Sequence, residues 1–257
     1  MSAPLVILQN SGSAEVRHCR LACILRGIEV ANCSLEVLAA HTHDLCAGAV
    51  PVGSVEFVRR AMELVGIYEP ENISYPEHAQ RFLRRSLRRT VAGQVLGRWF
   101  VKPIITKAFT GFVFDSIADR ERYDLAARDS FDAFMAMPAD APVWIAEPVA
   151  FQSEWRYYVH RGQVVGSARY DPDGEEGAVA PDIGVVLECV RALHWDRPYA
   201  LDMGVLTGGE TALVEVNDFW AIGLYGRALT ADKYLEMLCD RWAEMRLPWH
   251  KKGPIRR

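Results

Sequence analysis

Apolar positions in the first third of the chain follow a strand–helix–strand order. Three short apolar runs predict strands, at residues 5–9, 28–33 and 49–53. Residues 14–26 and 55–65 instead place apolar side chains at helical spacing. We expect the first helix to stop at Gly27, since glycine adopts a left-handed cap without strain, and Ser54 to cap the second. This order indicates a parallel α/β unit.

The spacing of apolar residues changes near Trp99. Most later segments alternate, or are rich in β-branched and aromatic residues, with glycine or proline–glycine turns between them. Six segments read as strands, at residues 99–103, 143–151, 154–162, 163–171, 199–205 and 211–218. Helical patterns cover residues 123–137 and 182–193, and a last helix is expected to start at Thr230, a good N-cap. The second part of the chain therefore favours antiparallel sheets.

Residues 76–91 contain the run RFLRRSLRR, which we interpret as a helix with one apolar side. Its five arginines fill the remaining surface, at positions 81, 84, 85, 88 and 89. A solvated basic helix is one interpretation. A rim that attracts an anionic substrate is the other.

Composition removes several classes of function. The 257 residues carry a net charge of −4, and half are apolar, so a basic footprint for nucleic acid is lacking. No stretch of apolar residues is long enough to span a membrane, and the N-terminus lacks a secretory pattern, so we expect a cytoplasmic protein. Six cysteines without a CxxC pair are expected to be reduced thiols.

Two predicted strands joined by a Gly-Gly turn carry three oxygen-bearing side chains. Asp202 lies on the first strand, and Glu215 and Asn217 lie two residues apart on the second, so they point to the same face. Hard oxygen donors at this place suit Mg²⁺, which adds substrate phosphates to its shell. The alternative is that all three are polar residues at strand ends that face water.

Two lysines flank a segment suited to phosphate. Lys102 ends an apolar strand, where an ammonium group is costly unless it meets an anion, and Lys107 follows in a loop with hydroxyls and one glycine, Gly111. No Walker A motif is present. The alternative is one surface lysine and one lysine that extends its ammonium to water.

A broken strand lies near the middle of the chain. Glu147 ends an apolar run, and Pro148 interrupts the ladder, which leaves backbone groups free to pair with an adenine edge. Glu154 could accept from ribose hydroxyls, and the planar fork of Arg156 suits a phosphate or carboxylate. The alternative is a surface ion pair between Glu154 and Arg156.

Taken in order, the segments FVKP, ITKAFTG, WIAEPV, SEWR, ALDMGV and VEVND resemble the ATP-grasp superfamily over roughly residues 96–228. The chain is most similar to the divergent clade marked by one arginine and two lysines, which includes a cell-division-cycle protein of translation-initiation-factor assembly. The resemblance implies an α/β (α+β) fold. A small Rossmann-like pre-ATP-grasp domain would cover residues 1–95, and an ATP-grasp domain with antiparallel sheets would cover residues 96–257.

The resemblance also implies a role for each site residue. Contacts to ATP would come from Lys102, Lys107, Glu147, the backbone of Val149, and Glu154. Mg²⁺ would be held by Asp202, Glu215 and Asn217. Catalytic charge would come from Arg156, Lys107 and Arg169, with Asp171 beside Arg169. The phosphate loop departs from the family pattern, because it carries Phe109 and Phe112 in place of several glycines and serines.

The implied reaction is ATP-dependent ligation in the cytoplasm. A substrate carboxylate, such as that of an amino acid, peptide or protein, would attack the γ-phosphate to give an acyl-phosphate and ADP, and an amine would then displace phosphate. Two alternatives stay open, because a fold does not determine a function. The chain could be an ATP-binding assembly factor that forms no bond, or a kinase that stops at phosphate transfer.

Overall fold

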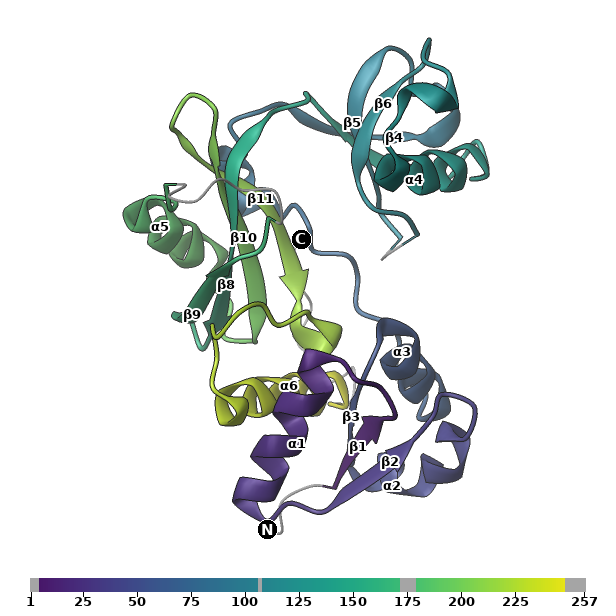
Figure 1. Ribbon diagram of the computed structural model, residues 1–257, viewed down its shortest axis with the longest axis vertical. Helices are drawn as coiled ribbons and strands as arrows, with labels where there is room; N and C mark the ends of the chain where they lie inside the picture. Colours follow the sequence, from purple (N-terminus) through teal and green to yellow (C-terminus); the bar gives the residue numbers. More distant parts are fainter. Residues whose placement is uncertain (1–4, 106–107, 172–178, 248–257) are drawn as a thin grey trace.

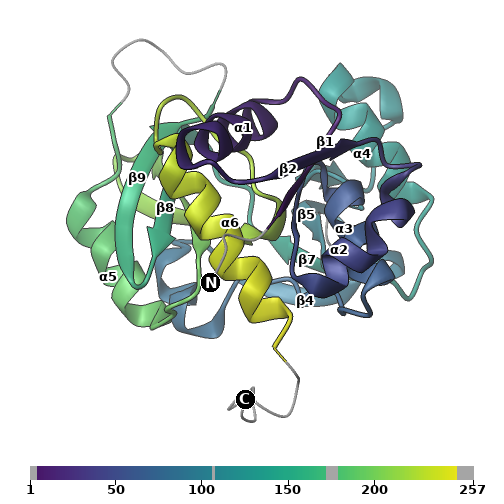
Figure 2. The ribbon, with the colours of Figure 1, turned by 90° about the horizontal axis from the view of Figure 1, so that it is seen from below.

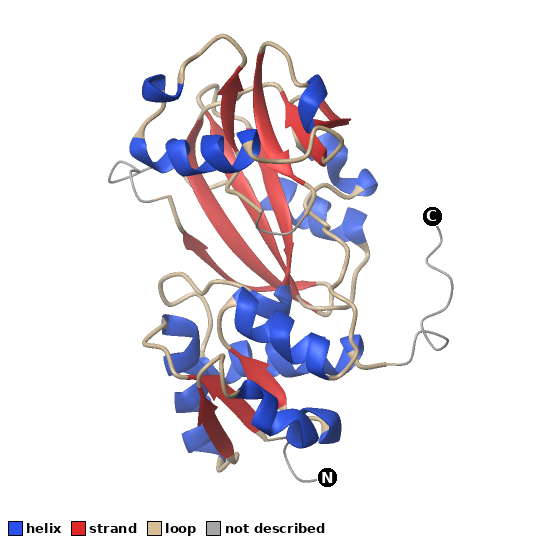
Figure 3. Cartoon of the chain, turned by 90° about the vertical axis from the view of Figure 1, so that its right-hand side faces the viewer, coloured by secondary structure: helices blue, strands red, loops and turns tan. Residues whose placement is uncertain are grey.

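A computed structural model of the chain describes residues 5–105, 108–171 and 179–247. Within these ranges three β-sheets follow one another along the long axis of the molecule, with helices packed against them (Figure 1). Figure 3 shows long strands through the middle of the molecule and helices gathered towards its two ends. The predicted mixed α/β class with antiparallel sheets is confirmed.

The N-terminal sheet is parallel and has the strand order β2-β1-β3. Its strands are β1 (Val6–Gln9), β2 (Val30–Cys33) and β3 (Val50–Val52). The helices of this unit are α1 (Ala14–Arg26), α2 (Thr42–Ala47) and α3 (Val55–Leu64), with a 3₁₀ turn at Leu38–His41. Both predicted caps are confirmed: Gly27 has φ of 63°, and Ser54 Oγ accepts from the N–H of Phe57 at 3.3 Å.

The second sheet is antiparallel and has the order β4-β7-β5-β6. Its strands are β4 (Leu87–Val91), β5 (Arg98–Pro103), β6 (Phe112–Asp115) and β7 (Pro142–Ala146). Helix α4 (Leu125–Met135) covers one face, and Phe134 packs there against the rings of Phe112 and Phe114.

The predicted helix over residues 76–91 is wrong. Residues Glu77–Phe82 form a 3₁₀ helix, and the second half of the arginine run is β4, which pairs with β7. Arginine is a good helix former, but this preference is small for each residue. Ladder hydrogen bonds to β7 outweigh it here, and the β-branched Thr90 and Val91 favour a strand.

The third sheet is antiparallel and has the order β11-β10-β8-β9. Its strands are β8 (Phe151–His160), β9 (Gln163–Arg169), β10 (Tyr199–Leu206) and β11 (Thr211–Asp218). Helix α5 (Ile183–Leu193) packs on one face, and a 3₁₀ turn (Phe219–Ala221) follows β11.

The C-terminal helix α6 (Ala231–Met245) lies beside α1 (Figure 2). Its N-cap is Thr230, as predicted, and its apolar stripe shares one core with β1 and β3. The last helix of the chain therefore completes the core of the first unit. The predicted boundary between residues 95 and 96 stays a prediction; β4, which precedes it, pairs with β7, which follows it.

Two further expectations concern the cell rather than the fold. Among the described residues, no helix combines the length and the apolar character needed to cross a membrane. The cytoplasmic location stays a prediction. All six cysteines are free thiols.

Candidate functional site

A cavity of about 880 Å³ lies where the second and third sheets face the loop after β11. Most of the predicted site residues line it: Lys102, Glu147, Val149, Glu154, Arg156, Glu215 and Asn217. They come from several different strands and the β7–β8 connection, so only the folded chain brings them together. The volume is within the range of about 300–1,000 Å³ typical of ligand pockets.

Lys102 is held at the cavity by β5. Its Nζ contacts Glu215 Oε2 on β11 and lies 5.3 Å from the ring centre of Tyr75. Burial lowers the pKa of Lys102 to about 7, and the nearby carboxylate of Asp202 opposes that shift. An ammonium in this position gains from an anion in the cavity.

Arg156 and Asp202 form a buried, bidentate ion pair between β8 and β10. The strand register places the two residues opposite each other, and their N–O distances are 2.8 and 2.7 Å. The Asp202 side chain is 0% exposed and that of Arg156 is 8% exposed. Burial acts to lower the pKa of Arg156, but the Asp202 carboxylate outweighs it, so the pKa is raised. Arg156 therefore stays charged at the cavity wall.

The donor set around Asp202 fits a small, hard cation. The register confirms that Asp202 lies opposite Glu215, and Glu215 and Asn217 line the cavity from the same face of β11. Asn217 Nδ2 donates to Asp202 at 3.0 Å, so its amide oxygen is left for another partner. Asp202 accepts three hydrogen bonds of about four that a carboxylate can take, so one position remains. Two carboxylates and an amide oxygen could hold Mg²⁺.

The opposite end of the cavity is suited to a flat ring with hydroxyls. Strand β7 ends at Ala146, and the Glu147 carboxylate accepts from the N–H of Ser86 at 2.9 Å, which lowers its pKa. Glu154 accepts from the hydroxyl of Tyr170 at 2.7 Å, and burial raises the pKa of Glu154. Apolar side chains line this part: Phe100, Val113, Val149, Phe151 and Val214.

The sequence analysis missed Arg85 as a site residue. Its guanidinium lines the cavity and donates to the carbonyl oxygens of Leu213 (2.9 Å) and Val214 (3.2 Å). Burial lowers the pKa of Arg85, and no carboxylate pairs with it among the described residues. A buried charge bonded mainly to neutral groups favours an anionic ligand. The β-branched residues after the arginine run were the available signal, since they favour a strand over an exposed helix.

Two predicted catalytic residues are not among the described residues that line the cavity. Lys107 lies outside the part of the chain that the structure describes. Arg169 ends β9 and pairs with Asp171 at 2.7 Å, and neither of these two is part of the described lining. The catalytic roles of Lys107 and Arg169 stay predictions.

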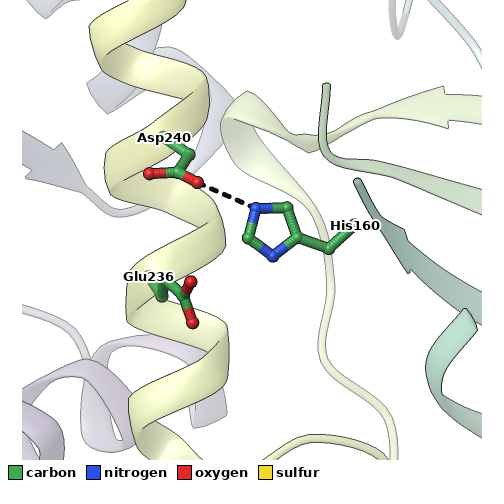
Figure 4. Close-up of side chains that lie close together, drawn as sticks. All are labelled: His160, Glu236 and Asp240. Carbon is green, nitrogen blue, oxygen red and sulfur yellow. Dashed lines mark hydrogen bonds and ion pairs between the residues drawn. The ribbon is translucent and has the colours of Figure 1, made fainter. Parts of the chain in front are cut away.

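Within the described ranges, one other group of side chains has metal-ligand spacing: His160, Glu236 and Asp240 (Figure 4). His160 Nε2 lies 2.8 Å from Asp240 Oδ2, and Arg161 contacts both carboxylates, at 3.0 and 3.5 Å. Lys233 also pairs with Glu236. The protein's own cations already neutralise these acids, so the group ties β8 to α6 as an ion-pair network.

Family comparison agrees with this geometry. The family model that matches residues 82–237 describes an ATP-grasp domain, family 2 of the clade marked by one arginine and two lysines. A search of curated proteins matched none.

Several solved structures share the fold at low sequence identity. D-alanine–D-alanine ligase from Bacillus anthracis, complexed with ATP, is 16% identical with a TM-score of 0.53, and the match covers 98% of this chain and 100% of that one. A RimK-domain ATP-grasp protein from Sphaerobacter thermophilus is 15% identical with a TM-score of 0.54, covering 94% and 100%. N5-carboxyaminoimidazole ribonucleotide synthetase, in its ADP complex, is 12% identical with a TM-score of 0.57, covering 93% and 78%.

Proposed function

Because the chain belongs to family 2 of this ATP-grasp clade, we propose that it is an ADP-forming ligase that joins a carboxylate to an amine with ATP and Mg²⁺. One observation carries the proposal. A single cavity gathers three cations, Lys102, Arg85 and Arg156, beside the carboxylate of Glu215 and the amide of Asn217. Cations next to oxygen donors are what a metal-bound triphosphate needs.

Each group in the cavity then has a role. Lys102 and Arg85 bind phosphate oxygens, and the β7–β8 connection at Glu147 and Val149 faces the adenine. Glu154 accepts from the ribose hydroxyls. Asp202, Glu215 and Asn217 hold Mg²⁺, which supplies positive charge to the phosphate oxygens when bound.

Arg156 offsets the charge on the transferring phosphate. Its ion pair with Asp202 and its position over the rings of Tyr170 and Tyr225 fix the guanidinium before the reaction. Prearranged charge of this kind acts without reorganisation at the moment of transfer. The substrate carboxylate attacks the γ-phosphate, and an amine attacks the resulting acyl-phosphate and releases phosphate. Amino acids and short peptides are the substrates we propose to test first.

The experiment uses purified full-length protein with ATP, Mg²⁺ and pools of amino acids or short peptides. ADP and phosphate are measured, and products are identified by mass. We expect release of ADP and phosphate that depends on the added pool, together with a new amide. A phosphorylated product without free phosphate would instead indicate a kinase, and tight ATP binding without turnover would indicate an assembly factor.

Replacing Arg85 by methionine should weaken the binding of Mg·ATP roughly tenfold or more, since a charged hydrogen bond contributes about 1.5–3 kcal/mol. The guanidinium lines the cavity without a carboxylate partner among the described residues, so a phosphate is the partner we assign to it. Isothermal titration measures the affinity. Arg88→Met is the control, because Arg88 is exposed on β4 and its guanidinium lies over the Trp99 ring. Equal affinities in the two variants would remove Arg85 from the site.

A further inference from the structure

Residues 222–225 form a stretch of cavity wall whose backbone is held by side chains from other elements. The hydroxyl of Tyr234 on α6 donates to the carbonyl of Ile222 at 2.6 Å. The hydroxyl of Tyr158 on β8 donates to the carbonyl of Gly223 at 3.0 Å. These bonds replace the ladder that a strand would have, so the shape of this wall depends on distant side chains.

The amide of Leu224 is held by a residue from the other end of the chain. Its N–H donates to Glu15 Oε1 at 2.9 Å, across 209 residues of sequence. Glu15 lies in the first turn of α1, in the N-terminal unit. Leu224 is buried, with 7% of its surface exposed, so no nearby water replaces this acceptor if it is removed.

The next residue connects this wall to the arginine of the proposed site. The N–H of Tyr225 donates to Tyr158, and its ring stacks on Tyr170 with the ring centres 5.2 Å apart. The guanidinium carbon of Arg156 lies 5.1 Å from the ring centre of Tyr225. Arg156 Nη1 also donates to the carbonyl of Gly223 at 3.4 Å. The position of the wall therefore determines two of the contacts that orient Arg156.

We propose that Glu15 is a positioning residue for the nucleotide site, acting through Leu224 and Tyr225 on Arg156. This rests on the proposed function, because Arg156 acts there on the transferring phosphate. The N-terminal unit thereby contributes to catalysis without touching ATP. Glu15 is needed as a hydrogen-bond acceptor rather than as a charge, since the group it accepts from is a neutral amide.

The experiment compares Glu15→Ala and Glu15→Gln with the unchanged full-length protein. Hydrogen exchange of the amides over 222–225, affinity for a non-hydrolysable ATP analogue with Mg²⁺, and ADP release from Mg·ATP are measured. For Glu15→Ala we expect exchange at Leu224 and ADP release each to change by about tenfold, faster and slower respectively, with nucleotide affinity within about twofold. Glutamine keeps an oxygen acceptor, so Glu15→Gln should stay within about threefold of the unchanged protein.

Asp232→Ala is the matched control. Asp232 also lies in the first turn of a helix, α6, but it pairs with Arg26 at the surface and does not reach the cavity. The proposal is overturned if Glu15→Ala behaves like this control, or if Glu15→Gln loses as much as Glu15→Ala. If the unchanged protein releases no ADP, the proposed function fails, and the exchange data alone still decide whether Glu15 holds the wall.

Discussion

Replacing Glu215 by glutamine should lower ATP turnover by roughly 10²–10³-fold, the loss seen when one prearranged electrostatic contact is removed. Glu215 supplies a carboxylate to the cavity and contacts the ammonium of Lys102, so glutamine removes one negative charge from the proposed metal site. The shape of the side chain is kept, and 22% of it is exposed, so the free energy of unfolding should change little. Turnover is measured as ADP release across a Mg²⁺ titration.

The shift of the Mg²⁺ titration separates this role from a general loss of activity. We expect half-maximal turnover of Glu215→Gln to need more Mg²⁺, and Asn217→Asp to change the titration as well, because a charged ligand replaces an amide oxygen. Glu210→Gln is the control, since Glu210 is exposed on the turn between β10 and β11. An unchanged Mg²⁺ curve in Glu215→Gln would mean that the metal assignment is wrong.

Replacing Asp202 by alanine should lower the free energy of unfolding by about 3–5 kcal/mol, the cost of breaking a buried ion pair from one side. The variant leaves the Arg156 guanidinium buried without its carboxylate, and Asn217 also loses an acceptor. Urea denaturation followed by tryptophan fluorescence measures the change. Asp232→Ala, which breaks a pair whose side chains are 43% and 47% exposed, should cost no more than about 1 kcal/mol.

A double variant keeps this prediction testable if Asp202→Ala does not fold. Arg156→Met combined with Asp202→Leu removes both charges and fills the space with apolar groups, so most of the lost stability should return. ATP turnover should remain absent, because the charge that acts on the phosphate is gone. A single variant that costs less than about 1 kcal/mol would show that the pair does not bear on stability.

Patterns within single segments were sufficient to predict the elements that depend on local chemistry. The cap at Gly27, the N-caps at Ser54 and Thr230, and the Gly-Gly hairpin that places Asp202 opposite Glu215 follow from residues close in sequence. The arginine run shows the limit of this reasoning. Its helical preference was real but small, and pairing with β7, a strand far along the chain, decided its structure.

The sequence by itself determined which residues could bind phosphate and metal, because residue type decides charge and the hard oxygen donors that Mg²⁺ prefers. Only the tertiary structure decided which of these residues meet. It joined Asp202 to Arg156, brought Arg85 into the cavity without a carboxylate partner among the described residues, and left Arg169 paired with Asp171 outside the described cavity lining. It also placed Glu15 against Leu224. Such contacts join strands and helices far apart in sequence, and the periodicity of one segment carries no information about its neighbours in space.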